Sequence, residues 1–236
     1  MNGIERITLK KVVFGIRFDN HFRIEDALGE IVDDILSTDT HGPDRFQNIG
    51  YGPGVRQLFR EDRTETISFN RNDTIYENTS AKCSVRELPS LANGFLDVVW
   101  SAVCENTDAP NINRYGCLVG FDLPNEWDPI RTLLDTESND HSEFDLRFSH
   151  RILVPKALAT RDVNDYRNVI YELTRKTGKT AATIDFQHYY SPSLDDEKSR
   201  KENPYMAFIE KATSHFQGTG WEFLRSHVER IQRAAA

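Results

Sequence analysis

Alternation of apolar and polar residues predicts a strand near the N-terminus, followed by a helix. The apolar residues of the strand repeat every second position, as in a strand with one buried face: Val12, Phe14, Ile16 and Phe18. The next apolar residues are spaced as on one face of a helix: Ile24, Leu28, Ile31, Val32, Ile35 and Leu36. The chain therefore begins with a half-buried strand and an amphipathic helix.

The next segment, His41–Gly54, is predicted to be a loop because Gly42-Pro43 and the run Gly50–Gly54 interrupt regular structure. Two strands are expected after it, at Val55–Arg60 and Thr64–Asn70, with Thr74–Asn78 as a candidate third. A second helix is predicted from Pro89, with Ser90 as its N-cap. Its expected inner face consists of Leu91, Phe95, Val98, Val99, Ala102 and Val103.

Strands dominate the second half of the chain and are expected at Ile112–Leu123, Glu143–Val154, Tyr166–Thr174 and Thr180–Tyr190. Two acidic segments poor in apolar residues, Asp135–Glu143 and Asp195–Glu202, are expected to be exposed loops. A helix should begin at Asn203-Pro204, with asparagine as cap and proline at the first helical position. A last helix should follow Gly218–Gly220. The expected inward residues of these two helices are Met206, Ile209, Ala212, Phe216, Trp221, Leu224, Val228 and Ile231.

This order predicts an α+β protein with a largely antiparallel sheet and packed helices. Strands follow strands more often than they alternate with helices, which disfavours a doubly wound parallel sheet. The predicted order is β-α-β-β-α, then four strands and a helical C-terminus. Residues 1–236 are predicted to form a single domain; two sheet-plus-helix halves, 1–108 and 109–236, are the alternative.

Composition narrows the class of protein. The net charge of −8 repels phosphate backbones at long range, which disfavours nucleic acid as a direct partner. Three cysteines without metal-ligand spacing argue against a disulfide scaffold and indicate reduced thiols. Met1–Lys11 lacks the apolar core of a secretory signal, and no apolar run is long enough to span a membrane. We therefore expect a cytoplasmic protein without a membrane partner.

Two glycine-containing segments resemble parts of nucleotide-binding loops. Gly178-Lys179-Thr180 matches the end of a P-loop, but the position that requires the first glycine is Leu173. A hairpin turn at Lys176–Lys179 is the simpler interpretation. In Gly50–Gly54 the spacing of a dinucleotide loop is missing, and Pro53 removes a backbone donor. A connector is predicted there.

Asp185 and His188 are the most suggestive polar pair, but their spacing separates them. On a regular strand Asp185, Gln187 and Tyr189 share one face, whereas His188 lies on the other face with apolar residues. Asp185 and His188 therefore cannot form a catalytic dyad. His188 is predicted to be a core or interface histidine, and Asp185 an exposed strand carboxylate with a catalytic acid as the less favoured alternative.

No segment carries a specific catalytic signature. No carboxylate–x–lysine pair of the metal-dependent nuclease type falls in a predicted strand, and the seven histidines show no His-x-x-x-His spacing. No Gly-x-Ser-x-Gly is present, and Cys104 and Cys117 fall within apolar patterns. No catalytic residue, metal site or cofactor is therefore predicted.

Four segments resemble those of a sporadically distributed family of bacterial proteins of about 250 residues without an established activity. Phe14–Phe18 corresponds to a first strand with a Glu-x-Arg-Phe-like end, and Asn113–Val119 resembles a mid-chain strand rich in Arg, Gly and Tyr. Thr183–Phe186 matches a late strand with a central aspartate, and His215-Phe216 matches a C-terminal helix. The match departs at Cys117-Leu118, where the family usually has a second arginine.

The resemblance implies no activity, but the family's patchy distribution implies mobile genomic islands, including phage-defence and toxin–antitoxin loci. We predict a non-enzymatic binding or assembly subunit that acts with a partner protein, with Arg114, Asp185 and Tyr189 as binding residues. Two alternatives stay open. One is a metal-dependent hydrolase or nuclease with a site assembled from distant carboxylates and histidines; the other is a small-ligand sensor with a pocket between sheet and helices. The oligomeric state is open.

Overall fold

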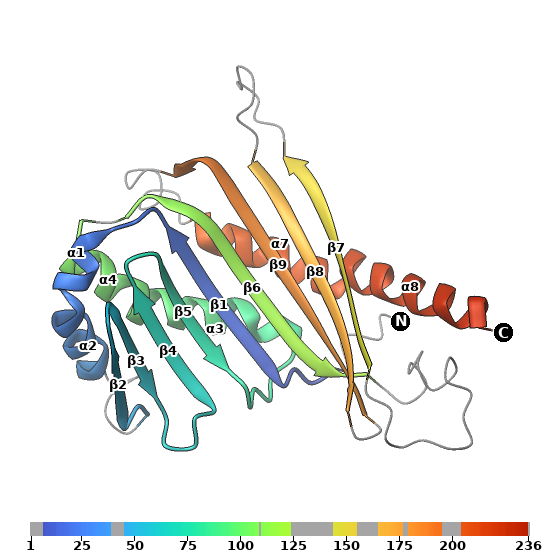
Figure 1. Cartoon of the computed structure of the whole chain (residues 1–236), viewed down its shortest axis with the longest axis horizontal. Coiled ribbons are helices and arrows are strands. Elements are labelled where there is room, and N and C mark those ends of the chain that lie inside the picture. Colours follow the sequence, from blue (N-terminus) through green and yellow to red (C-terminus); the bar gives the residue numbers. More distant parts are fainter. Residues whose placement is uncertain are drawn as a thin grey trace.

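The computed structural model describes residues 7–38, 45–108, 110–123, 144–154, 165–176, 179–194 and 204–235. The strands form one nine-stranded sheet in the order β2-β3-β4-β5-β1-β6-β9-β8-β7 (Figure 1). Every neighbouring pair is antiparallel. The strands are β1 (Lys11–Phe18), β2 (Asn48–Gly52), β3 (Val55–Phe59), β4 (Glu65–Asn70), β5 (Asp73–Asn78), β6 (Ile112–Asp122), β7 (Phe144–Val154), β8 (Asp165–Lys176) and β9 (Lys179–Leu194).

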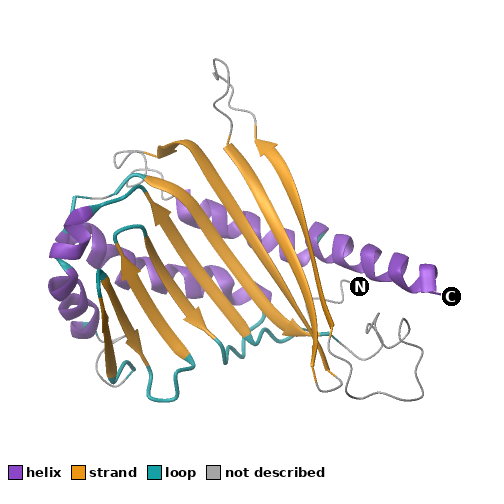
Figure 2. Ribbon diagram, in the orientation of Figure 1, coloured by secondary structure: helices purple, strands orange, loops and turns teal. Residues whose placement is uncertain are grey.

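The described helices pack behind the sheet or beside its β2 edge, so that one face carries no described helix (Figure 2). They are α1 (Phe22–Asp26), α2 (Leu28–Ser37), α3 (Leu88–Phe95), α4 (Ser101–Asn106), α7 (Pro204–Gln217) and α8 (Thr219–Ala235). We call the two sides of the sheet the helix-covered face and the helix-free face. The molecule is thus a mixed α and β fold with a large antiparallel sheet, as predicted.

The core lies between the sheet and the helices, and the alternation predicted for the first strand is confirmed. Val12, Phe14, Ile16 and Phe18 are all buried on the helix-covered face. Aromatic rings dominate the contact with the helices. Tyr115 of β6 lies 5.0 Å from Tyr205 of α7, ring centroid to centroid. Burial of these large rings is the main driving force that holds the helices on this face.

Strand β1 lies at the centre of the sheet and links the two halves of the chain. It pairs with β5 through Val12–Arg17 and with β6 through Lys11–Phe18. One continuous ladder of hydrogen bonds therefore runs from strands of the first half to strands of the second. Four strands lie between α2 and α3 in the chain, whereas the predicted order had two.

One of the two further strands is β5, at the candidate third strand Thr74–Asn78, and the other is β2, which occupies Asn48–Gly52 of the predicted loop at His41–Gly54. Its residues are at most partly buried, so no apolar alternation marks it in the sequence. Gly52 pairs with Val55, and Pro53-Gly54 forms a two-residue turn between β2 and β3. Gly54 has φ +64°, a left-handed conformation that glycine adopts at low cost. The breaker residues mark a tight turn here instead of a connector.

The two predicted helices of the first half are each divided. The first breaks at Ala27, which separates α1 from α2. The second begins earlier than Ser90, because Ser84 and Glu87 form a capping box ahead of α3. A π-helical turn at Leu96–Trp100 then joins α3 to α4 and shifts the register of the backbone hydrogen bonds by one residue. Leu91, predicted to face inward, is 37% exposed.

In the second half, the four strands and two helices occur as predicted. Lys176 pairs with Lys179, which confirms the hairpin at the segment that resembles a P-loop. Pro204 is the first residue of α7, and α8 begins at Thr219. The predicted loops at Asp135–Glu143 and Asp195–Glu202, and the side chains of Val228 and Ile231, lie outside the described residues.

Candidate functional site

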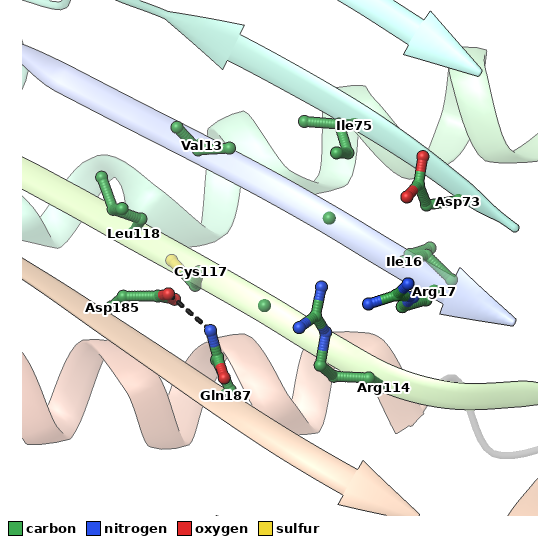
Figure 3. Close-up of a pocket in the computed structure, with 12 residues that line it drawn as sticks. Val13, Ile16, Arg17, Asp73, Ile75, Arg114, Cys117, Leu118, Asp185 and Gln187 are labelled. Atoms are coloured by element: carbon green, nitrogen blue, oxygen red, sulfur yellow. Dashed lines mark hydrogen bonds between the residues drawn. The ribbon is translucent and has the colours of Figure 1, made fainter. Parts of the chain in front are cut away.

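A hollow lies on the helix-free face where the central strands β1 and β6 run side by side (Figure 3). Its volume is about 130 Å³. Gly15 and Gly116 pair directly across the two strands and form its floor. The residues that line it come from β1, β5, β6 and β9: Val13, Gly15, Ile16, Arg17, Asp73, Ile75, Arg114, Gly116, Cys117, Leu118, Asp185 and Gln187.

The hollow exists because neither floor position carries a side chain. A Cβ placed on Gly116 would meet no heavy atom within 4 Å, and one on Gly15 would only touch Ile75 Cγ1 at 3.9 Å. Packing therefore does not require glycine at either position. Glycine in a strand interior weakens the strand, so two facing glycines in the central pair lower the stability of the fold. No packing contact at these positions compensates for that loss.

A row of hydrogen-bonded side chains borders the hollow along β6 and β9. Arg114 Nη1 donates to Tyr189 Oη at 3.2 Å, and Tyr189 Oη donates to Gln187 Oε1 at 2.8 Å. Gln187 Nε2 in turn donates to Asp185 Oδ2 at 2.5 Å. We call Arg114, Tyr189, Gln187 and Asp185 the open row. Three of these, Arg114, Asp185 and Tyr189, were predicted from the sequence as binding residues, and Gln187 was not.

Aromatic and guanidinium groups extend this row towards β7. The rings of Tyr189 and Tyr166 stack with centroids 4.4 Å apart. The guanidinium of Arg114 lies 5.5 Å from the centre of the Tyr189 ring, and that of Arg151 lies 4.7 Å from the centre of the Tyr166 ring. The two tyrosines thus stack on each other on the helix-free face, with one arginine at each end of the pair. The cation–π contact at each end is favourable.

The electrostatics of the hollow are mixed. Burial raises the pKa of Asp185, against the hydrogen bond from Gln187 and the charge of Arg114, which both lower it. Asp185 is partly buried and is not the exposed carboxylate that the sequence predicted. Across the hollow, Asp73 accepts a hydrogen bond from Asn70 Nδ2 at 2.7 Å. Among the described residues, the Arg17 side chain forms no ion pair or hydrogen bond.

The structure keeps Asp185 and His188 apart, as predicted. His188 is 7% exposed and lies on the helix-covered face, where its Nε2 is 3.5 Å from Asp165 Oδ2. Burial lowers the pKa of His188, against the nearby Asp165 carboxylate, which raises it. The predicted core histidine is confirmed, and its neighbour Asp165 was not identified from the sequence.

A second polar cluster lies on the helix-covered face, and we call Arg45, Glu65, Tyr76 and Asn78 the closed cluster. Glu65 is 3% exposed and accepts hydrogen bonds from Arg45 Nε at 2.9 Å, Tyr76 Oη at 2.6 Å and Asn78 Nδ2 at 3.1 Å. Burial raises the pKa of Glu65, but the hydrogen bonds of Arg45 and Tyr76 and the charge of Arg45 outweigh it, so that the pKa is lowered. Burial and the Glu65 carboxylate raise the pKa of Tyr76 to about 12.

Metal ligands, thiols and membrane-spanning helices were the remaining features to look for in the described part of the chain. Within it, no three His, Cys, Asp or Glu side chains are grouped so that they could hold a metal ion. The three cysteines are free thiols, as predicted, but only Cys117 is fully buried. Burial raises the pKa of the Cys117 thiol, which disfavours the reactive thiolate. None of the described helices has the length and apolarity needed to cross a membrane.

Comparisons with known proteins do not assign a family. No protein-family model matches the chain, and no curated protein matches it. Among solved structures, the chain is similar to DynU16, a protein of the dynemicin biosynthetic locus, at 12% sequence identity and a TM-score of 0.24. That similarity covers 90% of this chain and 99% of DynU16. A TM-score this low indicates neither a shared fold nor a shared function.

Proposed function

We propose that this chain is a non-enzymatic subunit that binds a partner protein through its helix-free face. In this proposal the hollow above Gly15 and Gly116 is the socket for one side chain of the partner. The observation that carries the proposal is this pair of facing glycines, which leave an opening that the fold itself does not need. The resemblance noted in the sequence makes a neighbouring gene the expected source of the partner.

The size of the hollow favours a single side chain over a whole metabolite. Pockets for drug-sized ligands measure about 300–1,000 Å³. The hollow measures about 130 Å³. An apolar cavity of about 150 Å³ holds one benzene molecule. The apolar walls formed by Val13, Ile75 and Leu118 therefore suit one aromatic ring or one branched aliphatic side chain.

The rim supplies the residue types that dominate binding energy in protein interfaces. Arginine and tyrosine are enriched among residues whose truncation costs most, and such residues cluster near the centre of protein interfaces. Here Arg17 and Arg114 border the hollow, and Tyr189 lies beside Arg114. The two guanidinium groups suit an acidic group next to the anchoring side chain. The expected partner segment therefore combines one apolar anchor with a carboxylate.

Filling the hollow tests this proposal. We expect Gly116→Val to place its methyl groups in the socket and lower partner affinity at least 100-fold, about 2.7 kcal/mol. The free energy of unfolding should stay the same or rise by up to about 1 kcal/mol, because a β-branched residue suits a strand better than glycine. Ala181→Val is the matched control, since Ala181 lies on the same face but four residues along β9 from Asp185.

Native mass spectrometry measures the outcome on protein purified gently from cells that express its neighbouring genes. The proposal predicts a stoichiometric partner on the natural protein and on Ala181→Val, and its loss from Gly116→Val. A natural protein that elutes without any partner would contradict the proposal. Equal retention of the partner by Gly116→Val would show that the partner binds elsewhere.

A further inference from the structure

A groove separate from the hollow lies on the helix-covered face of the sheet, between strands β7, β8 and β9 and helix α7. Its volume is about 530 Å³, within the range of small-molecule pockets. Ile152 of β7, Arg167 of β8 and Phe186 of β9 form its sheet side. Lys211 and His215 of α7 line its helix side. The groove is therefore large enough for a metabolite, unlike the hollow on the helix-free face.

Arg167 is the feature of this groove that the fold does not explain. It is partly buried, and its Nε is shielded from solvent without a hydrogen-bond partner. Among the described residues, no carboxylate pairs with it. A shielded Nε donor without a hydrogen-bond partner is costly, so Arg167 is expected to bind an anion that enters the groove.

His215 is held in place and does not compete for that anion. Its Nε2 lies 2.9 Å from Tyr171 Oη, and its Nδ1 lies 3.0 Å from Thr219 Oγ1. Burial, with smaller contributions from His150 and Arg167, lowers the pKa of His215 to about 4. The imidazole is therefore a neutral, fixed wall at neutral pH, and the positive charge of the groove comes from Arg167 and Lys211.

We propose that this groove binds a small organic monoanion whose carboxylate pairs with Arg167 and whose apolar or aromatic body packs on Phe186 and Ile152. The guanidinium fork matches a carboxylate with two parallel hydrogen bonds. Lys211 on the opposite wall adds a second cation. Glu210 on the rim disfavours a second negative charge, which selects against a dianionic phosphate. This site is independent of the partner surface proposed above.

Methyl NMR of the full chain tests the site with three probes: an aromatic carboxylate, a neutral molecule of the same size, and an inorganic anion. The probes are benzoate, its neutral isostere benzamide, and inorganic phosphate. The δ1 methyl of Ile152 reports on the groove, and that of the buried Ile67 in β4 reports on the rest of the fold. Benzoate should shift the Ile152 signal in a saturable way with millimolar affinity, while the Ile67 signal stays in place. Benzamide and phosphate should bind at least tenfold more weakly.

Variants identify the group that recognises the carboxylate. Arg167→Gln should lower benzoate affinity at least tenfold and leave benzamide unchanged, whereas Arg167→Lys should retain part of the affinity. Arg151→Gln is the control, because Arg151 is a β7 arginine on the helix-free face. An unmoved Ile152 signal would overturn the proposal, as would equal affinity for benzoate and benzamide. Phosphate that binds as tightly as benzoate would overturn the assignment to carboxylates.

Discussion

Two polar clusters occupy opposite faces of the same sheet, and they differ in whether their hydrogen bonds close on themselves. In the closed cluster, the buried carboxylate of Glu65 accepts from three side chains that surround it. In the open row, Arg114, Tyr189, Gln187 and Asp185 form a chain of bonds along the edge of a hollow. The first arrangement satisfies a buried charge, whereas the second leaves guanidinium donors facing an empty space.

The difference indicates what each cluster does. A buried charge with all its partners present mainly affects folding, and removing one partner leaves the others unsatisfied. A partly exposed row beside a hollow that the packing does not require affects what binds there. We therefore assign the closed cluster to stability and the open row to partner recognition, and each assignment can be broken separately.

The largest effect is expected in the closed cluster. Glu65→Ala should lower the free energy of unfolding by about 3 kcal/mol, because it leaves a partly buried arginine and a buried tyrosine hydroxyl without their hydrogen-bond acceptor. The value should lie at the low end for buried pairs, since Arg45 is 33% exposed and can be hydrated. Urea denaturation at neutral pH measures this change. A loss below about 1 kcal/mol would show that the cluster contributes little to folding.

The pH dependence of this cluster has a definite sign. The pKa of Glu65 is lowered in the folded protein, so its ion pair stabilises the fold above the unfolded pKa of about 4.3. That stabilisation is lost as the pH falls through the lower, folded pKa. The difference in unfolding free energy between the natural protein and Glu65→Gln should therefore shrink as acid is added.

Substitution of Arg114 is expected to have a smaller effect than that of Glu65, and to weaken partner binding instead of folding. Arg114→Ala should weaken partner binding by about 2 kcal/mol, roughly 30-fold, with little change in stability. Arg114→Lys should recover only part of the loss, because a lysine keeps the charge but not the planar fork. Arg147→Ala is the control, since Arg147 is 67% exposed, pairs with Glu172 and does not line the hollow. Titration calorimetry with the purified partner measures all three, and equal losses for Arg114→Ala and Arg147→Ala would contradict the assignment.

The smallest effect is expected at Asp185 and has the opposite pH dependence to Glu65. Burial raises the pKa of Asp185, so its ionised form costs stability that grows as the pH rises from the unfolded value through the folded one. Asp185→Asn should therefore raise the free energy of unfolding at neutral pH by roughly 0.5 kcal/mol, and this gain should disappear in acid. Denaturation at pH 7 and pH 4 checks the sign, and a loss of stability at pH 7 would contradict it.

The sequence predicted much of the sheet and only part of the site, for reasons that can be traced to particular residues. Two-residue alternation identified β1 and β9, and it correctly placed Asp185, Gln187 and Tyr189 on one face of β9. The edge strand β2 was missed because its residues are glycine-rich and at most partly buried. The π-helical turn was missed because propensity does not reveal a shift of one residue in a buried helix.

The hollow could not be predicted, because it depends on pairing between distant parts of the chain. Gly15 and Gly116 are each an ordinary glycine in a strand pattern. Only the register of β1 against β6 places one directly opposite the other. A glycine inside a predicted strand was nevertheless a usable signal of a close approach or an opening, and both positions had it. The closed cluster was hidden for the same reason, since Arg45 lies 20 residues from Glu65.

Site-specific photo-crosslinking tests most directly the claim that the partner sits on the helix-free face. A benzophenone-bearing amino acid is placed either at Arg17, on the rim of the hollow, or at Glu30, an exposed position of α2 in the helical layer. Irradiation of each complex and mass analysis of the adducts then show which position touches the partner. We expect an adduct between chain and partner at Arg17 and none at Glu30. An adduct at Glu30 without one at Arg17 would contradict it.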